Sequence, residues 1–124
     1  MKYFLTLKNE TTSQSTCITL RLCNTFFLKF KGLMFQKDIK PLEGLVFDEF
    51  KDTKVNTAIH MLFMRFPIGV LWVNSEKIIV SKTYAKPWKL MYTPEKPARF
   101  VIEVHPEVLN YYQVGDKIIF DEKH

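Results

Sequence analysis

The chain has 124 residues, a formal net charge of +5 and a hydrophobic fraction of 47%. This composition, with eleven Phe, excludes an intrinsically disordered chain and favours a β-rich globular domain. One domain over residues 1–124 is expected, since a chain of this length buries about two thirds of the surface that its unfolded form exposes. No run reaches the roughly twenty apolar residues of a membrane span, and the N-terminus lacks the pattern of a signal peptide. We therefore expect a cytoplasmic protein without a membrane partner.

Charge and cysteine usage limit the partners further. The cations are mostly lysines scattered along the chain, and arginine occurs only at Arg21, Arg65 and Arg99. This pattern favours a solvated surface over a nucleic-acid interface, for which clustered arginine is better suited. Cys17 and Cys23 lie about 20 Å apart if the segment between them is one strand. Two free thiols in a reducing compartment are therefore expected rather than a disulfide.

The first half of the chain alternates strands with polar connections. Alternating apolar residues predict strands over 3–8 and 16–22, which we expect to form an antiparallel hairpin at the edge of the domain. A short helix is predicted from Asn24 or Thr25 to Leu33, because apolar residues recur there at helical spacing. A short strand over 44–47 and an exposed, charged turn over 48–54 follow.

The stretch from Asn56 to Asn74 is the most apolar of the chain, and the rest of the domain is expected to be built around it. It predicts a strand ending at Met64, a break at 67–69 and a second strand over 70–73, together a fully buried hairpin. Further elements are then predicted in chain order: a strand over 78–80, an irregular aromatic segment over 83–97, a strand over 98–104, a short helix over 106–112 and a strand over 117–120. The spacing indicates a β-sandwich or a partly open barrel with one or two short helices.

Several short motifs resemble one known family, the uncharacterised domain-of-unknown-function family 192 of bacteria and archaea. The motifs, in family order, are Gly32-Leu33-Met34-Phe35, Glu43-Gly44-Leu45-Val46-Phe47, Ile59-His60-Met61-Leu62-Phe63-Met64 with Pro67-Ile68, then Ala85, Pro87 and Tyr92, Pro97-Ala98-Arg99 leading to Glu103, and Gly115-Asp116. The resemblance covers about residues 25–120. It implies a compact β-sandwich or barrel of jelly-roll type and supplies no activity. The chain departs from the family at Gly69, where relatives usually carry Asp, and at 60–64, where most carry Trp-Met-Lys-Asn-Thr.

No motif in the chain specifies a catalytic mechanism. Gly-rich phosphate loops, nucleophile elbows and metal-ligand His or Cys spacings are absent, so no metal or other cofactor is predicted. His60 is either a proton-transfer or ligating group, or a buried residue whose ring nitrogens are satisfied by backbone or a carboxylate. Glu103 is either a general base with a raised pKa or a structural carboxylate paired with Arg99 or Arg65. Arg65 itself is either an anion-binding group or an exposed turn cation.

The favoured hypothesis is a small non-enzymatic binding or accessory module, monomeric or weakly dimeric. Its partner is expected to be a small apolar or sugar-like molecule, a peptide or another protein. Aromatic and Met side chains are expected to form an adaptable pocket, while Trp72 stays in the core. The candidate pocket comprises Gly32, Met34, Phe35, His60, Phe63, Arg65, Trp88, Tyr92 and Glu103. The alternatives are a hydrolase or isomerase using His60 and Glu103, with or without a divalent metal, and a weak nucleic-acid binder acting through surface lysines.

Overall fold

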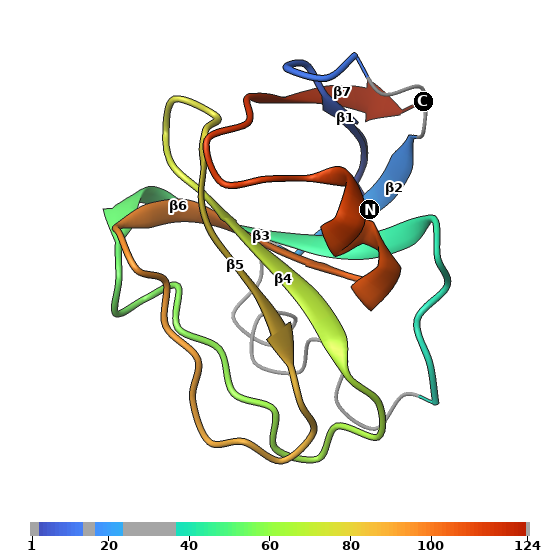
Figure 1. Ribbon diagram of the computed structural model, residues 1–124, viewed down its shortest axis with the longest axis vertical. Helices are drawn as coiled ribbons and strands as arrows, with labels where there is room; N and C mark the ends of the chain where they lie inside the picture. The colour runs from blue at the N-terminus through green and yellow to red at the C-terminus, as the bar shows by residue number, and fades with distance from the viewer. Residues whose placement is uncertain (1–2, 14–16, 24–36, 124) are drawn as a thin grey trace.

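The computed structural model describes residues 3–13, 17–23 and 37–123. This part of the chain forms seven strands and one short 3-10 helix (Figure 1). In chain order they are β1 (Tyr3–Asn9), β2 (Ile18–Leu22), β3 (Glu43–Thr53), β4 (Ile68–Val73), β5 (Ile79–Ala85), β6 (Ala98–Val104), the helix η1 (Pro106–Tyr111) and β7 (Ile118–Lys123). The expectation of a mostly β domain is confirmed. The helix predicted to end at Leu33 lies outside the described residues.

The seven strands form one sheet with the order β5-β4-β6-β3-β2-β1-β7. Neighbouring strands are antiparallel, except β2 and β3, which are parallel. The sheet curls into a half-barrel (Figure 1). Its two edges meet at one end, because Ile78, just before β5, forms a bridge with Lys117, just before β7. Of the two architectures expected from the sequence, the partly open barrel is the one observed.

Two apolar cores lie on opposite faces of this sheet. The inner core receives side chains from all seven strands and therefore fills the half-barrel. It comprises Leu7, Ile18, Leu20, Val46, Leu71, Val73, Ile79, Phe100, Ile102, Val104, Val108, Tyr112 and Ile118. The outer core lies on the other face and includes Met61 and Met64 from a loop. It comprises Cys23, Leu45, Phe47, Met61, Met64, Ile68, Val70, Trp72, Val80, Ala85, Ala98 and Val101. All six residues of β4 are buried because its side chains alternate between the two cores.

The buried hairpin predicted over 56–74 is only half correct. The second strand exists as β4, but it pairs with β5 and β6 instead of with the segment before it. Residues 54–67 form a loop whose only β-bridge among the described residues joins Ile59 to Tyr92. Met61 and Met64 face the outer core from this loop, and the Met64 N–H donates to the Met61 carbonyl oxygen at 3.3 Å, as in a tight turn. The apolar run therefore reflects a loop that covers the core.

The exposed turn predicted over 48–54 is wrong, because β3 continues to Thr53. The guanidinium of Arg99 on β6 donates two hydrogen bonds to the Asp48 carboxylate, at 2.8 and 3.0 Å, and ties the middle of β3 to its neighbour. The pairing of β3 with β6 shifts register between Asp48 and Thr53. The charged residues of this segment therefore belong to a solvated strand extension.

The other predicted strands are found close to their expected positions, but β5 continues to Ala85 and so includes the start of the segment predicted to be irregular over 83–97. The first two strands form the antiparallel hairpin β1–β2, although β1 is not at the sheet edge, because β7 pairs with its other side. The β4–β5 hairpin also forms, with a polar turn between the strands. The predicted helix over 106–112 is observed as η1, and the His105 side chain caps its first turn by accepting the Glu107 N–H at 3.1 Å. Its Leu109 packs against Gly69.

Candidate functional site

Two loops at one end of the half-barrel are tied together through their backbones. They comprise residues 54–67, which precede β4, and residues 86–97, which follow β5. The Met61 N–H donates to the Lys89 carbonyl oxygen at 2.9 Å, and the Trp88 N–H donates to the Met61 carbonyl oxygen at 2.6 Å. Ile59 and Tyr92 exchange two further hydrogen bonds, at 2.8 and 2.9 Å. These bonds hold the two loops as one unit, so side chains from both contribute to one surface.

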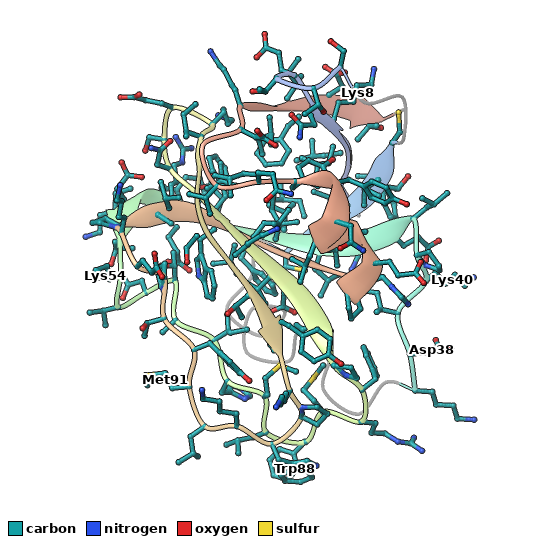
Figure 2. The ribbon with its side chains drawn as sticks, viewed as in Figure 1. Lys8, Asp38, Lys40, Lys54, Trp88 and Met91 are labelled. Carbon is teal, nitrogen blue, oxygen red and sulfur yellow. The ribbon has the colours of Figure 1, made fainter. Side chains whose placement is uncertain are left out.

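Besides Val55 at the start of the first loop, four apolar side chains on this unit face solvent, and we term these four the aromatic tip. They are Phe63, Trp88, Leu90 and Met91, with exposed fractions of 45%, 59%, 72% and 60%. The rings of Phe63 and Trp88 meet edge to face, with centroids 5.2 Å apart. Figure 2 shows Trp88 at one extreme of the long axis of the molecule, with Met91 close to the same end. The aromatic tip therefore projects away from both cores.

The backbone at the two rings is in an unusual conformation. Phe63 has a φ of 63° and Trp88 a φ of 69°, both in the left-handed region. Bulky residues rarely adopt this region, because their Cβ atoms crowd the neighbouring carbonyl oxygen. Glycine or asparagine is the usual choice at such positions. The two rings of the aromatic tip thus lie where the local backbone disfavours them, as does the exposed ring of Phe50 on β3.

Tyr92 and His60 lie between the aromatic tip and the outer core, and both are half-buried. Tyr92 packs against the outer core, its hydroxyl accepts the Lys86 N–H at 2.8 Å, and the Lys89 ammonium lies 4.4 Å from the centre of its ring. His60 accepts the Leu62 N–H at its Nδ1, 3.2 Å away. Both residues therefore help to shape the loops that carry the aromatic tip.

The charged residues that immediately flank the aromatic tip in sequence are all positive, and the nearest carboxylate along the two loops is that of Glu95. Within residues 58–67 and 86–93 the charged side chains are Arg65, Lys86 and Lys89, and neither segment contains Asp or Glu. All three cations are exposed. Arg65 is thus an exposed cation of the loop, as one of its two predicted roles required.

Glu103 is buried and lies one residue before the end of β6. It pairs in register with Leu45 on β3 and with Val70 on β4, and Arg21 on β2 extends the same row. Residues directly opposite one another share a face of a sheet. Leu45 and Val70 belong to the outer core, so the carboxyl group of Glu103 faces that core. Only 8% of the residue is exposed, and this burial raises the pKa of its carboxyl group to about 7.

The predicted partners of Glu103 are wrong. Arg99 binds Asp48, and Arg65 is exposed on its loop. Arg21 lies in the same row of the sheet as Glu103, and the thiol of Cys23 interacts electrostatically with both residues. Neither Arg21 nor Cys23 was predicted to belong to a site. Burial raises the pKa of the Cys23 thiol, the nearby Arg21 guanidinium lowers it, and the Glu103 carboxyl group raises it. The alternation of side chains along β2 and β6 puts these residues on the same face of the sheet, but their proximity follows only from the strand order. The strand order was not available from the sequence.

The nine residues of the predicted pocket therefore divide into three groups. Gly32, Met34 and Phe35 lie outside the described residues. His60, Phe63, Arg65, Trp88 and Tyr92 occupy the paired loops. Glu103 lies in the sheet. The described ranges contain no group of three or more His, Cys, Asp or Glu side chains able to hold a metal, and none of their helices is long and apolar enough to cross a membrane.

The fold and the site together define a small β half-barrel domain that carries an exposed aromatic surface on two paired loops. Comparison with known proteins identifies its family. Residues 7–120 match the DUF192 family, described as "Uncharacterized ACR". The chain belongs to this family, and the match begins earlier than the resemblance from about residue 25 suggested.

Two relatives of known sequence support the same assignment, and a solved structure shares the fold. A UPF0127 protein of Pyrococcus furiosus is 35% identical over 112 residues, which cover 89% of this chain and 93% of that protein. A UPF0127 protein of Thermococcus kodakarensis is 39% identical over 95 residues, covering 77% of this chain and 59% of that protein. A solved structure from Sinorhizobium meliloti, whose name proposes a transcription regulator, superposes with a TM-score of 0.83 at 19% identity and covers 97% and 94% of the two chains. At that identity the likeness concerns the fold alone.

Proposed function

We propose that this protein is a non-enzymatic binding module and that the aromatic tip is its binding surface. The proposal rests on the display of Phe63 and Trp88 as an exposed ring pair on a backbone that disfavours both residues. Contiguous exposed apolar side chains mark interaction sites in soluble proteins. The ligand classes raised by the sequence are a small apolar or sugar-like molecule and a peptide, each of which can contact such rings through an apolar face.

Energetics supports a role in binding over a role in folding. A left-handed backbone costs a bulky residue on the order of 1–3 kcal/mol. Burial of the ring would offset this cost, but Trp88 is mostly exposed. A surface whose conformation opposes stability is retained when it contributes a contact with another molecule. The backbone hydrogen bonds at Met61 fix the rings in place before any ligand arrives, which lowers the ordering cost of binding.

The proposal is tested by a thermal-shift screen against metals, nucleotides, sugars, amino acids and short peptides. A ligand that binds only the folded state raises the melting temperature as its concentration rises above its Kd. A ligand of the aromatic tip raises it in the wild-type protein and not in Trp88→Gly, whereas Val114→Ser, at an exposed apolar position outside the tip, responds as wild type. A shift that persists in Trp88→Gly contradicts the assignment of the surface.

The alternative function, a hydrolase or isomerase acting through His60 and Glu103, has less support. Glu103 faces the outer core from the centre of the sheet, while Nδ1 of His60 is engaged by an amide of its own loop. Activity screening of His60→Ala and Glu103→Gln tests this alternative, because loss of a measured turnover in both variants would favour it.

Nucleic-acid binding, the oligomeric state and the cellular compartment stay predictions.

A further inference from the structure

The aromatic tip combines three properties that restrict its partner. Its apolar side chains include the aliphatic groups of Leu90 and Met91 as well as two rings. Trp88 lies at the extreme of the long axis in Figure 2, so the surface projects from the molecule. Sites for soluble small molecules are instead usually concave, since most of the ligand surface must be covered.

The second property is charge. Arg65, Lys86 and Lys89 are exposed on the same two loops, and no carboxylate occurs in residues 58–67 or 86–93. The whole chain carries a net charge of +5, so its long-range field also favours an anionic partner. Apolar side chains flanked in sequence by cations match a surface that is apolar inside and negatively charged outside.

The third property is the residue types. Trp is enriched at the boundary between lipid headgroups and acyl chains, where its ring is apolar and its N–H stays hydrated. Leu, Phe and Met side chains enter the acyl region, and Lys and Arg extend their apolar stems while their charges stay at the headgroups.

From these properties we propose that the aromatic tip docks peripherally on an anionic lipid bilayer. Trp88, Leu90 and Met91 enter the headgroup boundary, with Phe63 beside them, and the three cations pair with lipid phosphates and carboxylates. This inference rests on the proposed function and names the partner of the same surface. The lack of an apolar run long enough to span a membrane predicted no membrane partner, but peripheral docking needs no such run.

Other partners fit the surface less well. A sugar is recognised by an aromatic face together with neutral or acidic hydrogen-bonding groups, yet cations outnumber carboxylates on these loops, where Glu95 is the one acidic residue. Single-stranded nucleic acid stacks on exposed aromatic faces. Here the edge-to-face pairing of Phe63 and Trp88 uses the face of one ring, and the aliphatic Leu90 and Met91 have no stacking role.

The experiment uses the full chain and large vesicles of two compositions: phosphatidylcholine alone, and equal parts of phosphatidylcholine and phosphatidylserine. We expect co-sedimentation with the mixed vesicles, weaker binding to phosphatidylcholine alone, and weakening by added salt. Trp88 emission moves to shorter wavelength on binding. Trp72 is buried, so Trp88→Phe abolishes this change without abolishing binding.

Matched double variants separate the aromatic tip from the general surface. Leu90→Ser with Met91→Ser removes two exposed apolar groups from the tip, and Leu42→Ser with Val114→Ser removes two exposed apolar groups elsewhere. We expect binding to be lost only in the first pair.

The charges are compared in the same way. Arg65→Ala with Lys86→Ala should weaken binding to the mixed vesicles about 25-fold, because each cation near an anionic surface contributes about fivefold. Lys51→Ala with Lys117→Ala lowers the net charge equally, at exposed positions outside the two loops, and should weaken it far less.

Absence of sedimentation with both vesicle types overturns the proposal, and so does equal weakening by the tip and control variants. Binding to an acidic peptide or an oligonucleotide without binding to vesicles also overturns it. In that case a thermal shift that depends on Trp88 still supports the proposed function, so the failure of one proposal is distinguishable from the failure of the other.

Discussion

The outer core and the aromatic tip are both rich in aromatic and Met side chains, and they lie next to each other, yet their energetics are opposite. Trp72, in the middle of β4, is 1% exposed and donates its indole N–H to the Thr57 carbonyl oxygen at 2.7 Å. Trp88 is mostly exposed and has a left-handed backbone. The comparison teaches that one tryptophan stabilises the fold while the other is held in place by a fold that is stable without it.

The largest difference is expected between alanine variants at these two positions. Trp72→Ala leaves a large cavity in the outer core and an unsatisfied carbonyl oxygen at Thr57, so the free energy of unfolding should fall by about 3–5 kcal/mol. Urea unfolding followed by far-UV circular dichroism measures this loss. Trp88→Ala is the matched control and should change the value by less than about 1 kcal/mol. Equal losses would contradict the division between the two regions.

A buried carboxyl group gives the outer core a pH dependence that the aromatic tip lacks. Burial raises the pKa of Glu103 from 4.5 to about 7 in the folded protein. Between these two pH values the folded state keeps the proton and the unfolded state has lost it, so the folded state binds more protons. The free energy of unfolding should therefore fall by about 3 kcal/mol in total as pH rises from about 4.5 through 7, and this group causes no further change once the pH is well above 7.

The variant Glu103→Gln isolates this contribution, because glutamine does not titrate. Urea unfolding at several pH values in this range gives the free energy of unfolding of the wild type and of Glu103→Gln. The wild-type value should fall as pH rises from low pH to 7, whereas the value for the variant should lack this fall. Parallel curves would show that Glu103 ionises normally and that a partner stabilises its charge.

An intermediate effect is expected at Gly69, where β4 contacts η1. A Cβ atom added there would lie 2.9 Å from Leu109 Cγ and 3.1 Å from its Cδ2. Gly69→Ala should therefore lower the free energy of unfolding by about 1–3 kcal/mol through overpacking. The double variant Gly69→Ala with Leu109→Ala should lose less stability than the sum of the losses of the two single variants. Additive losses would mean that the crowding lies elsewhere.

The smallest change in stability is expected from Trp88→Gly. Glycine tolerates a φ of 69° without steric cost, which offsets the lost ring contact with Phe63, an interaction of about 0.5–1.5 kcal/mol. The free energy of unfolding should stay within about 1 kcal/mol of the wild-type value. Thermal unfolding with equal scan rates provides the comparison, and a large loss would show that Trp88 supports the fold.

Much of the fold was predictable from the sequence, and the errors have physical causes. Alternation located the β1–β2 hairpin, and it also located β6, although β6 is buried on both faces and only Arg99 is half-exposed. The apolar run before β4 was assigned to a strand because its composition does not distinguish a buried strand from a loop that covers a core. Conversely, the charges of Asp48 to Thr53 concealed a strand extension that is solvated and anchored by Arg99.

The site was predictable only where neighbours in sequence are also neighbours in space. Trp88 was assigned to the surface and Trp72 to the core from their local context, and the structure places them so. The contact between Phe63 and Trp88 depends on the pairing of two loops on either side of the β4–β5 hairpin, which no local pattern encodes. The same reason accounts for the wrong partners of Glu103, since the row through Arg21 requires the strand order of the whole sheet.

The most direct test of the account measures stability and binding on the same preparation of Trp88→Gly. Urea unfolding should give a free energy of unfolding close to that of the wild type, and sedimentation with vesicles of phosphatidylcholine and phosphatidylserine should show that binding is largely lost. Together these two results would show that Trp88 is needed for vesicle binding and is not needed for the stability of the fold. Wild-type binding by the variant, or a variant that unfolds readily, would contradict the central claim that Trp88 serves contact with a partner and not the fold.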